Sequence, residues 1–208
     1  MKKESKTISL PTTAELENAL YKEKYKSRYK SMLRSTVYVL LVVFAISAIA
    51  ATLIFSVLQI SGTSMHPTLA ENDIVVALNM SDYKRGDIIA FYYNNRMLVK
   101  RVIATAGEWV EIDINGNVYV NKKLIDEPYI IEKHKGESDL IYPYQVPEGS
   151  YFVLGDEREN ALDSRNSLIG CVSKDDVVGK ILFRVWPLND LSKNFNLGGK
   201  WWNNKLMR

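Results

Sequence analysis

A long uncharged segment and a series of short alternating segments divide the chain. No charged residue occurs from Ser35 to Ala70, and the most apolar part runs from Val37 to Ile60. A helix over that part would be about 36 Å long, whereas the hydrocarbon core of a bilayer is about 30 Å thick. The pattern predicts one tilted transmembrane helix, which we place at residues 35–60.

The small-residue triplet Ala48-Ile49-Ala50 resembles the cleavage site of a secretory signal, but it lies in the middle of the apolar run. The apolar region of such a signal is only about 7–15 residues long. Cleavage there would also leave apolar residues on the mature N-terminus. We therefore expect a permanent anchor.

Beyond residue 60, short stretches rich in β-branched and aromatic side chains are separated by turn-forming residues, which is typical of strands. The predicted strands are Ile74–Leu78, Asp87–Tyr93, Leu98–Thr105, Trp109–Ile114, Val118–Val120, Tyr151–Leu154 and Val177–Val185. Asn115-Gly116 and Asn121-Lys122 predict turns, the first being a strong hairpin signal, and residues 132–149 predict a long excursion. We expect one mostly β domain over residues 61–190, followed by a tail over residues 191–208.

Charge is distributed unevenly about the apolar run. Residues 1–34 contain nine Lys or Arg and four acids, whereas residues 61–208 contain eighteen and twenty. Basic flanks of a transmembrane helix stay cytoplasmic. We therefore expect a single-pass protein of the cell membrane, with residues 1–34 as a basic cytoplasmic tail and an extracytoplasmic β domain. Because the excess positive charge lies beside the bilayer, it points to anionic lipid and not to nucleic acid as its partner.

Within the tail, Pro11 to Glu15 has the composition of a capped helix start. Apolar and aromatic residues then recur at helical spacing from Leu16 to Met32. This pattern indicates a solvated or membrane-skimming helix, with a helix that binds a partner protein as the alternative.

Ser64 follows the apolar run by four residues, so its hydroxyl lies within roughly 14 Å of the end of that run. A serine hydroxyl is a poor nucleophile until a base takes its proton. The chain contains two histidines. His66 would have to reach back to the Ser64 hydroxyl with an acid behind it, and His134 stands in a charged loop where we expect it to be solvated.

Lys100 is the other candidate base, and with Arg101 it interrupts an otherwise apolar strand. A lysine with the ordinary pKa of about 10.4 is protonated at neutral pH, but burial lowers that pKa by up to about 3–5 units. Serine–lysine pairs are a known form of nucleophile activation. The pattern alone leaves two possibilities open: Lys100 is catalytic, or one basic residue faces water while the other faces the core.

The single cysteine, Cys171, excludes an intrachain disulfide. No histidine lies near it in the sequence. We expect a small buried residue beside Val172 and not a thiol nucleophile.

Four blocks of sequence resemble the type I signal peptidases and occur in that family's order. The blocks are Gly62–Leu69, Arg85–Phe91, Leu98–Ile103, and Gly155–Arg158 with Asp163–Arg165. They follow a single N-terminal span, as in many Gram-positive members, and the resemblance extends over residues 38–188. Each block alone is weak evidence, but four in order are specific.

The resemblance implies a mostly β fold of the signal-peptidase type, related to the self-cleaving repressor proteases, after one transmembrane helix. It implies Ser64 as the nucleophile and Lys100 as the general base, with no metal or other cofactor. It further implies a membrane-bound serine endopeptidase that removes signal peptides from exported preproteins, cutting after small residues at −1 and −3.

The chain departs from the family's pattern beside both implied catalytic residues. Some relatives carry an oxyanion-binding serine at the position of Gly62, so we expect the Ser64 backbone N–H to be assisted by another backbone or water donor. Ala161 replaces the serine that orients the lysine in the family, and Glu157 replaces an asparagine. Ser164 is the candidate substitute for the missing hydroxyl.

Asp163 and Arg165 resemble the family's supporting charge pair, and we expect Asp156 and Arg158 to be structural. Apolar residues beside the nucleophile are expected to form shallow pockets that admit alanine and crowd larger groups, with ordinary core packing as the alternative for each. The pocket candidates are Ile60, Met65, Leu69, Leu98 and Val99.

Three tryptophans near the C-terminus, Trp186, Trp201 and Trp202, are candidates for the membrane interface, where amphipathic rings are enriched. For Trp201 and Trp202, a disordered tail is the alternative.

Two other classes of protein are alternatives to a signal peptidase. A self-cleaving repressor needs a DNA-binding domain, and residues 1–34 contain no helix-turn-helix. A non-catalytic membrane-anchored relative, acting as an assembly or binding factor, typically lacks one member of the Ser/Lys pair. Both Ser64 and Lys100 are present, which favours an enzyme.

Overall fold

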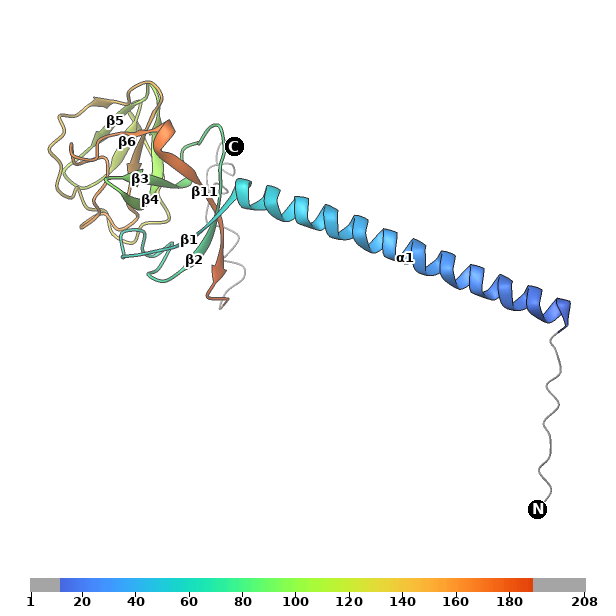
Figure 1. The fold of residues 1–208 in the computed structure, drawn as a ribbon. Coiled ribbons are helices and arrows are strands. Elements are labelled where there is room, and N and C mark those ends of the chain that lie inside the picture. The colour runs from blue at the N-terminus through green and yellow to red at the C-terminus, as the bar shows by residue number, and fades with distance from the viewer. Residues whose placement is uncertain (1–11, 189–208) are drawn as a thin grey trace, which may run out of the picture. The chain divides into compact units, whose positions relative to one another are not determined.

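The computed structural model describes residues 12–188, and the chain divides into a helical unit and a β unit after Ala51 (Figure 1). Helix α1 spans Thr13–Ile54 and is long and apolar enough, by length and composition, to cross a membrane. At its start the Thr12 N–H donates a hydrogen bond to the Glu15 carboxylate at 3.0 Å, as in a capping box. The predicted helix start is therefore confirmed.

The helix ends before the apolar run does. Phe55–Gln59 form strand β1, which pairs antiparallel with β2, Ile74–Leu78. The predicted helix over residues 35–60 is thus wrong at its C-terminal end, where the last expected turns form a strand, and at its N-terminal end it is continuous with the helix predicted from Leu16 to Met32. Pairing with β2 gives the backbone of β1 hydrogen-bond partners that a helix would otherwise supply. The helix from residue 35 to its end is about 30 Å long, so it matches a hydrocarbon core without tilt.

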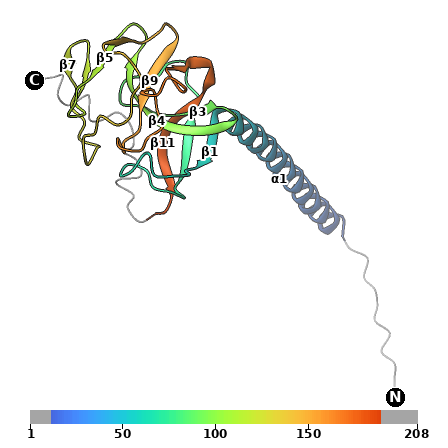
Figure 2. The same cartoon turned by 90° about the vertical axis from the view of Figure 1, so that its left-hand side faces the viewer.

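The β unit contains two sheets, and all their strand pairs are antiparallel. The larger sheet has the order β1-β2-β11-β3-β4-β9-β10 and the smaller one β7-β6-β5-β8. The remaining elements are β3 Ile88–Tyr93, β4 Arg96–Thr105, β5 Trp109–Ile112, β6 Val118–Val120, β7 Lys123–Leu124, β8 Tyr144–Gln145, β9 Ser150–Leu154, β10 Val172–Ser173, the 3-10 helix η1 Lys174–Asp176, and β11 Val177–Trp186. Within the β unit, the smaller sheet lies at the end away from β1 and β11 (Figure 2). The mostly β fold is confirmed.

The sequence pattern predicts the longer strands closely and misses the shorter ones. Ile74–Leu78 and Val118–Val120 have their predicted bounds, and the other five predicted strands differ by one or two residues at an end. The strands β7, β8 and β10 have two residues each, too few to show an alternation. Asn121 and Lys122, both at positive φ, form the tight hairpin between β6 and β7, and the predicted excursion over residues 132–149 contains only β8 among the described strands.

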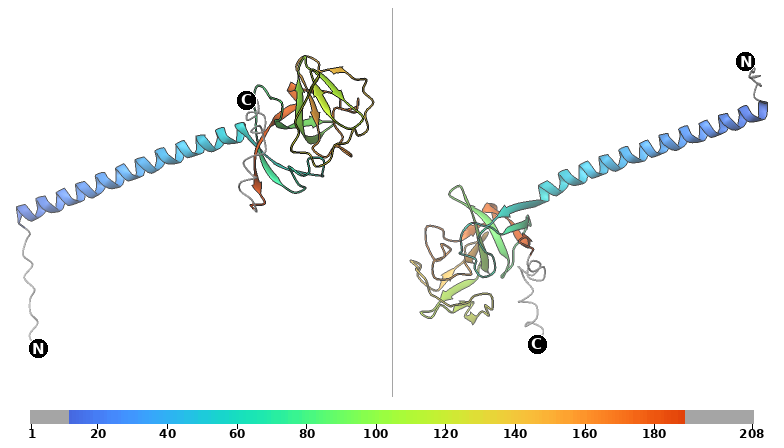
Figure 3. Two further views of the ribbon diagram at one scale, coloured as in Figure 1. Left: turned by 180° about the vertical axis from the view of Figure 1, so that it is seen from behind. Right: turned by 90° about the horizontal axis from the view of Figure 1, so that it is seen from below.

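One of three hydrophobic clusters supports the segment that carries Ser64. It lies against β1, β2, β3 and β11, whose ribbons can be followed from behind and from below in Figure 3. Its buried members are Ile60, Met65, Leu69, Val75, Ala77, Ile88, Ala90 and Ile181. Because three of them flank Ser64 in the sequence, the turn that contains Ser64 is fastened to the core on both sides.

Candidate active site

Ser64 and Lys100 lie within hydrogen-bonding distance of each other. The Lys100 Nζ donates to the Ser64 Oγ at 2.6 Å. Ser64 is in the turn that follows β1, and Lys100 is in the middle of β4. The fold therefore brings together two residues that are 36 positions apart in the chain.

The turn around Ser64 is held by backbone hydrogen bonds at both ends. The Ile60 N–H donates to the Asp73 carbonyl at 2.8 Å, and the Leu69 N–H donates to the Met65 carbonyl at 3.0 Å. Gly62 has a φ of +86°, in the left-handed region that favours glycine over residues with a side chain. The absence of a hydroxyl at position 62 thus agrees with the backbone conformation of this turn.

The Lys100 side chain is almost wholly removed from water, with 2% of its surface exposed. This burial lowers the pKa of the Lys100 ammonium from 10.5 to about 8, against the opposing effect of the Asp163 and Asp156 carboxylates; the Arg165 guanidinium lowers it slightly further. At pH 7 about a tenth of Lys100 is therefore neutral and able to accept a proton, and this fraction rises with pH.

Arg101 is buried as well, with 3% exposure. Its guanidinium forms a two-pronged ion pair with Asp156, Nε to Oδ1 at 2.8 Å and Nη2 to Oδ2 at 2.6 Å. The alternative in which either Lys100 or Arg101 faces water is therefore wrong. Strand alternation places the two side chains on opposite faces of β4, and each face is covered.

The segment after β9 packs directly on the backbone of Ser64. The Glu157 N–H donates to the Ser64 carbonyl at 3.1 Å. A Cβ at Gly155 would lie 2.6 Å from that carbonyl oxygen and 2.4 Å from the Ala161 Cβ. Gly155 is needed for this close approach, a role that sequence reasoning missed because it depends on a contact between distant segments.

The predicted charge pair of Asp163 and Arg165 is present and buried. The Arg165 Nε and Nη2 each lie 2.9 Å from an Asp163 oxygen, and the Asp163 Oδ2 also accepts the Gly155 N–H at 3.0 Å. The Ser164 hydroxyl accepts the Val153 N–H on β9 at 2.9 Å. Ser164 thus holds the backbone of β9, while the Lys100 Nζ contacts the Ser64 Oγ; that Ser164 substitutes for the lysine-orienting hydroxyl stays a prediction.

A small cavity of about 80 Å³ opens beside Ser64 and Lys100. Four of the five predicted pocket residues line it together with Gly62: Ile60, Met65, Leu98 and Val99. Leu69 has no exposed surface and packs in the core, so its prediction as a pocket residue is wrong. The hydrogen bond from its N–H to the Met65 carbonyl closes a turn and directs Leu69 to the interior.

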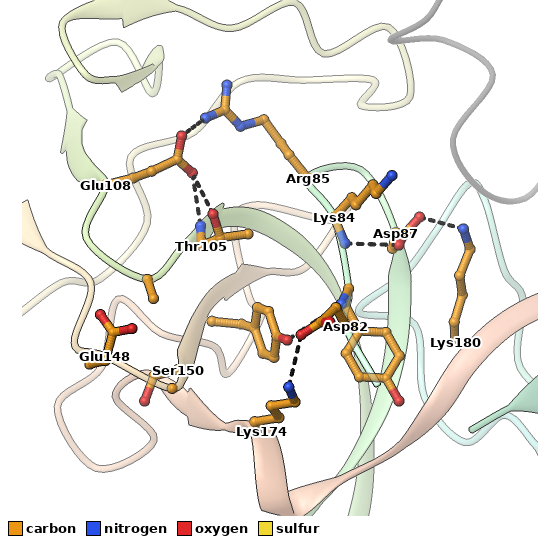
Figure 4. A pocket seen from close by; sticks show the side chains of 14 residues that line it. Asp82, Lys84, Arg85, Asp87, Thr105, Glu108, Glu148, Ser150, Lys174 and Lys180 are labelled. Carbon is orange, nitrogen blue, oxygen red and sulfur yellow. Dashed lines mark hydrogen bonds and ion pairs between the residues drawn. The ribbon is translucent and has the colours of Figure 1, made fainter. Parts of the chain in front are cut away.

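A larger cavity, of about 740 Å³, is lined by neither Ser64 nor Lys100. Figure 4 shows that its lining is dominated by charged side chains. Three ion pairs join acids to bases within the lining: Arg85 with Glu108, Lys174 with Asp82, and Lys180 with Asp87. These charges compensate one another. We therefore assign the candidate active site from the contact between Ser64 and Lys100 and not from the size of a cavity.

The remaining candidates lie apart from the Ser64–Lys100 contact. His66 is exposed, and the His134 Nε2 lies 3.2 Å from the Glu132 carboxylate in a partly exposed loop. Cys171 is partly buried, and burial raises the pKa of its thiol to about 11, so it is a poor nucleophile. Trp186 is 57% exposed, whereas Trp201 and Trp202 lie outside the described residues.

Comparison with known proteins identifies the family of this chain. The family model described as "Signal peptidase, peptidase S26" matches residues 33–186. Signal peptidase IB of Staphylococcus aureus is 38% identical over 176 residues, which cover 74% of this chain and 90% of that protein. Signal peptidase I of Bacillus amyloliquefaciens is 32% identical over 166 residues, covering 74% and 88%. A crystal structure of a signal peptidase I from Enterococcus faecalis V583 is 30% identical, covering 49% of this chain and 98% of that one with a TM-score of 0.42.

The matched region includes the apolar half of α1 and the described β unit. The protein is accordingly a peptidase whose N-terminal helix is suited to anchoring it in a membrane. The chain belongs to the type I signal peptidases, in the peptidase S26 family.

Proposed function

We propose that this protein removes N-terminal signal peptides from exported preproteins, with Ser64 as the nucleophile and Lys100 as the general base. The observation that supports this most strongly is the 2.6 Å contact between the Lys100 Nζ and the Ser64 Oγ. Burial lowers the pKa of that lysine to about 8. A base within hydrogen-bonding distance of a hydroxyl, with a pKa near the working pH, is what general-base catalysis needs.

In the proposed reaction, neutral Lys100 takes the proton from the Ser64 hydroxyl as the Oγ attacks the scissile carbonyl carbon. The C–N bond then breaks, Lys100 gives the proton to the departing amine, and the signal peptide remains as an ester on Ser64. A water molecule, deprotonated by the same lysine, attacks the ester carbonyl; the C–Oγ bond breaks, Lys100 returns the proton to the Ser64 Oγ, and the signal peptide leaves with a carboxylate end. Lys100 therefore accepts a proton twice and donates it twice in each turnover.

The negative charge that develops on the carbonyl oxygen needs preorganised donors, and one such donor contributes about 2.7–4 kcal/mol in other serine peptidases. The Ser64 backbone N–H is the first candidate. Gly62 has no side-chain hydroxyl that could serve as a second donor. Its positive φ and the open space around it support a second donor from the backbone or from water.

The small cavity beside Ser64 supports cleavage after small side chains. Its volume of about 80 Å³ and its lining by Ile60, Leu98 and Val99 leave little room for a large group. An apolar wall beside Ser64 favours preproteins with alanine at −1 or −3, because it excludes bulkier side chains. Specificity of this kind rests on crowding as much as on attraction.

Residues 1–34 are proposed to be cytoplasmic and the β domain extracytoplasmic, with the C-terminal tail from residue 191. The segment from Tyr21 to Arg34 contains six basic residues and a single acid, Glu23. This excess of positive charge supports the proposed orientation, because basic flanks of a transmembrane helix stay cytoplasmic. Ser64 lies ten residues beyond the end of α1, whereas the predicted helix placed it four residues beyond. A segment of ten residues extends at most about 36 Å, which replaces the limit of roughly 14 Å on the distance between Ser64 and the end of the helix. The nucleophile still lies near the membrane surface where a signal peptide ends.

The function is tested by incubating the purified full-length chain in detergent with a preprotein that has alanine at −1 and −3. We expect one cut, and sequencing of the product should place the new N-terminus directly after the −1 alanine. A preprotein with leucine at both positions is the matched control and should remain intact. An alanine preprotein that stays whole, with folded protein present, would leave a non-catalytic binding or assembly role as the better account.

A further inference from the structure

The Arg101 guanidinium joins the segments that carry the site. It pairs with Asp156 through two hydrogen bonds of 2.8 and 2.6 Å, donates to the Gly86 carbonyl at 3.0 Å, and donates to the Thr68 hydroxyl at 3.2 Å. Thr68 belongs to the turn of Ser64, and Asp156 follows β9. Since Lys100 directly precedes Arg101 in β4, this one guanidinium links the strand of the proposed base to the turn of the proposed nucleophile.

Tyr129 covers the face of this guanidinium. The Arg101 Cζ lies 3.9 Å from the centroid of the Tyr129 ring, well within the range of a cation–π contact. The Tyr129 hydroxyl donates to the Glu127 carboxylate at 2.8 Å. Burial, followed by the charge of Glu127, raises the pKa of the Tyr129 phenol well above its ordinary value, so the hydroxyl stays protonated and able to donate.

Glu127, which accepts the hydrogen bond from the Tyr129 hydroxyl, is itself held in place. Its carboxylate is buried and forms a two-pronged ion pair with Arg158, and the Arg158 Nε donates to the Gly155 carbonyl at 3.1 Å. Gly155 is the residue that packs on the backbone of Ser64. Tyr129 is therefore connected to the site by two routes, through Arg101 and through Arg158.

Both Glu127 and Tyr129 come from the segment that leaves the smaller sheet after β7. That segment is anchored by Ile125, which is buried in a hydrophobic cluster formed by residues of both sheets and whose N–H donates to the Val118 carbonyl at 3.0 Å. The position of the Tyr129 ring is thus set by a part of the fold that contributes neither Ser64 nor Lys100.

We propose that Tyr129 is a positioning residue, which acts through Arg101 and Asp156 to keep Lys100 beside Ser64 in a constant electrostatic environment. This inference rests on the proposed function. The Asp163 carboxylate, and after it the Asp156 carboxylate, raise the pKa of Lys100. On this proposal the positive charge of Arg101, which is paired with Asp156, opposes the effect of Asp156. Without the ring, water reaches the guanidinium, the pair with Asp156 loosens, and the pKa of Lys100 moves up towards 10.5.

The test compares Tyr129→Ala and Tyr129→Phe in the full-length protein in detergent, with Tyr119→Ala as the matched control. Tyr119 is in strand β6 of the smaller sheet, and its hydroxyl contacts Asp113. For Tyr129→Ala we expect the midpoint of the pH–kcat profile to rise by about one unit and kcat at pH 7 to fall about tenfold, with KM nearly unchanged. Tyr129→Phe, which keeps the ring on Arg101, should retain most of the wild-type profile. Tyr119→Ala should lower thermal stability and leave the midpoint in place.

A second readout separates failure of this inference from failure of the proposed function. Lysine labelled with ¹³C at Cε reports the pKa of Lys100 by NMR without any substrate, and the Lys100→Met spectrum assigns the signal. We expect Tyr129→Ala to raise that pKa, and Tyr129→Leu to do the same if the alanine variant does not fold. An unchanged Lys100 pKa and pH profile in the Tyr129 variants, with the wild type active, would overturn the inference and leave the function intact. A wild type that cleaves no preprotein would instead count against the function, and the titration would still decide the role of Tyr129.

Discussion

Gly155 approaches the Ser64 carbonyl so closely that a Cβ would lie 2.6 Å from the carbonyl oxygen. Real Cβ atoms essentially never come this near to backbone, so any side chain at position 155 must displace the turn that holds Ser64. A displacement of this kind matters because hydrogen-bond geometry at a reacting hydroxyl tolerates little change. The position of the nucleophile thus depends on a residue with no chemistry of its own.

We predict that Gly155→Ala lowers stability by about 1–3 kcal/mol, as overpacking does, and also lowers kcat of the folded protein. Gly179→Ala is the matched control, because its Cβ would lie 2.8 Å from the Leu78 carbonyl oxygen, away from Ser64. Thermal unfolding and preprotein cleavage measure the two effects. If both variants lose stability and both keep the wild-type kcat, the packing of Gly155 does not position Ser64.

Cleavage should depend on the protonation of Lys100. Burial lowers the pKa of this lysine to about 8, and only the neutral amine accepts the Ser64 proton. We therefore predict that kcat/KM of the full-length enzyme rises with pH to a plateau above a midpoint near 8. A midpoint of about 6.5, the ordinary pKa of an imidazole, would instead indicate a histidine base.

Lys100→Met should make the folded protein more stable at neutral pH while removing its activity. The pKa of Lys100 is lowered from 10.5 to about 8, so the charged lysine costs on the order of 3 kcal/mol in the folded state. This cost is fully present below pH 8, where both states are protonated, and disappears as the pH rises towards 10.5. Denaturant unfolding at pH 7 and at pH 10 should therefore show a large gain for the variant at pH 7 and a small one at pH 10. An equal effect at both pH values would contradict the lowered pKa.

Enlarging the small cavity should relax the choice of substrate. Val99 lines the cavity and is partly buried, so Val99→Ala should increase kcat/KM for preproteins with valine or leucine at −1 or −3, by about 10-fold or more per lost contact that excluded them. Val178→Ala is the control, because Val178 packs on the same hydrophobic cluster but does not line the cavity. A similar relaxation in both variants would assign the effect to general loosening of the core.

The pattern of residues predicts the fold well where it is regular. The alternation in Ile74–Leu78 and Val118–Val120 predicts those strands with their observed bounds. It fails at Phe55–Gln59, because five uncharged residues directly after a helix have the same composition whether they form another turn or a strand. Pairing with β2, which begins after the Ser64 turn, decides between the two and is a tertiary contact.

The residues of the candidate site likewise divide into those that the sequence predicts and those that depend on tertiary contacts. Lys100 can be found as a candidate base because a basic pair interrupts an apolar strand, and the resemblance to the type I signal peptidases implies its pairing with Ser64. The roles of Gly155 and Tyr129 cannot be found in this way, since they arise from contacts between segments that the sequence does not place side by side. Leu69 shows the converse, because its nearness to Ser64 in the chain predicts a pocket position whereas the turn directs it into the core.

The central claim is that Ser64 is the nucleophile and Lys100 its base, and single-turnover cleavage of a preprotein by the full-length enzyme tests it most directly. Wild type, Ser64→Ala, Lys100→Met and His66→Ala should be compared after circular dichroism shows that each is folded. We predict that Ser64→Ala and Lys100→Met each reduce the rate by about 10⁴-fold or more, while His66→Ala, at an exposed position, stays close to wild type. Near-normal turnover by Lys100→Met together with an inactive His66→Ala would contradict the assignment.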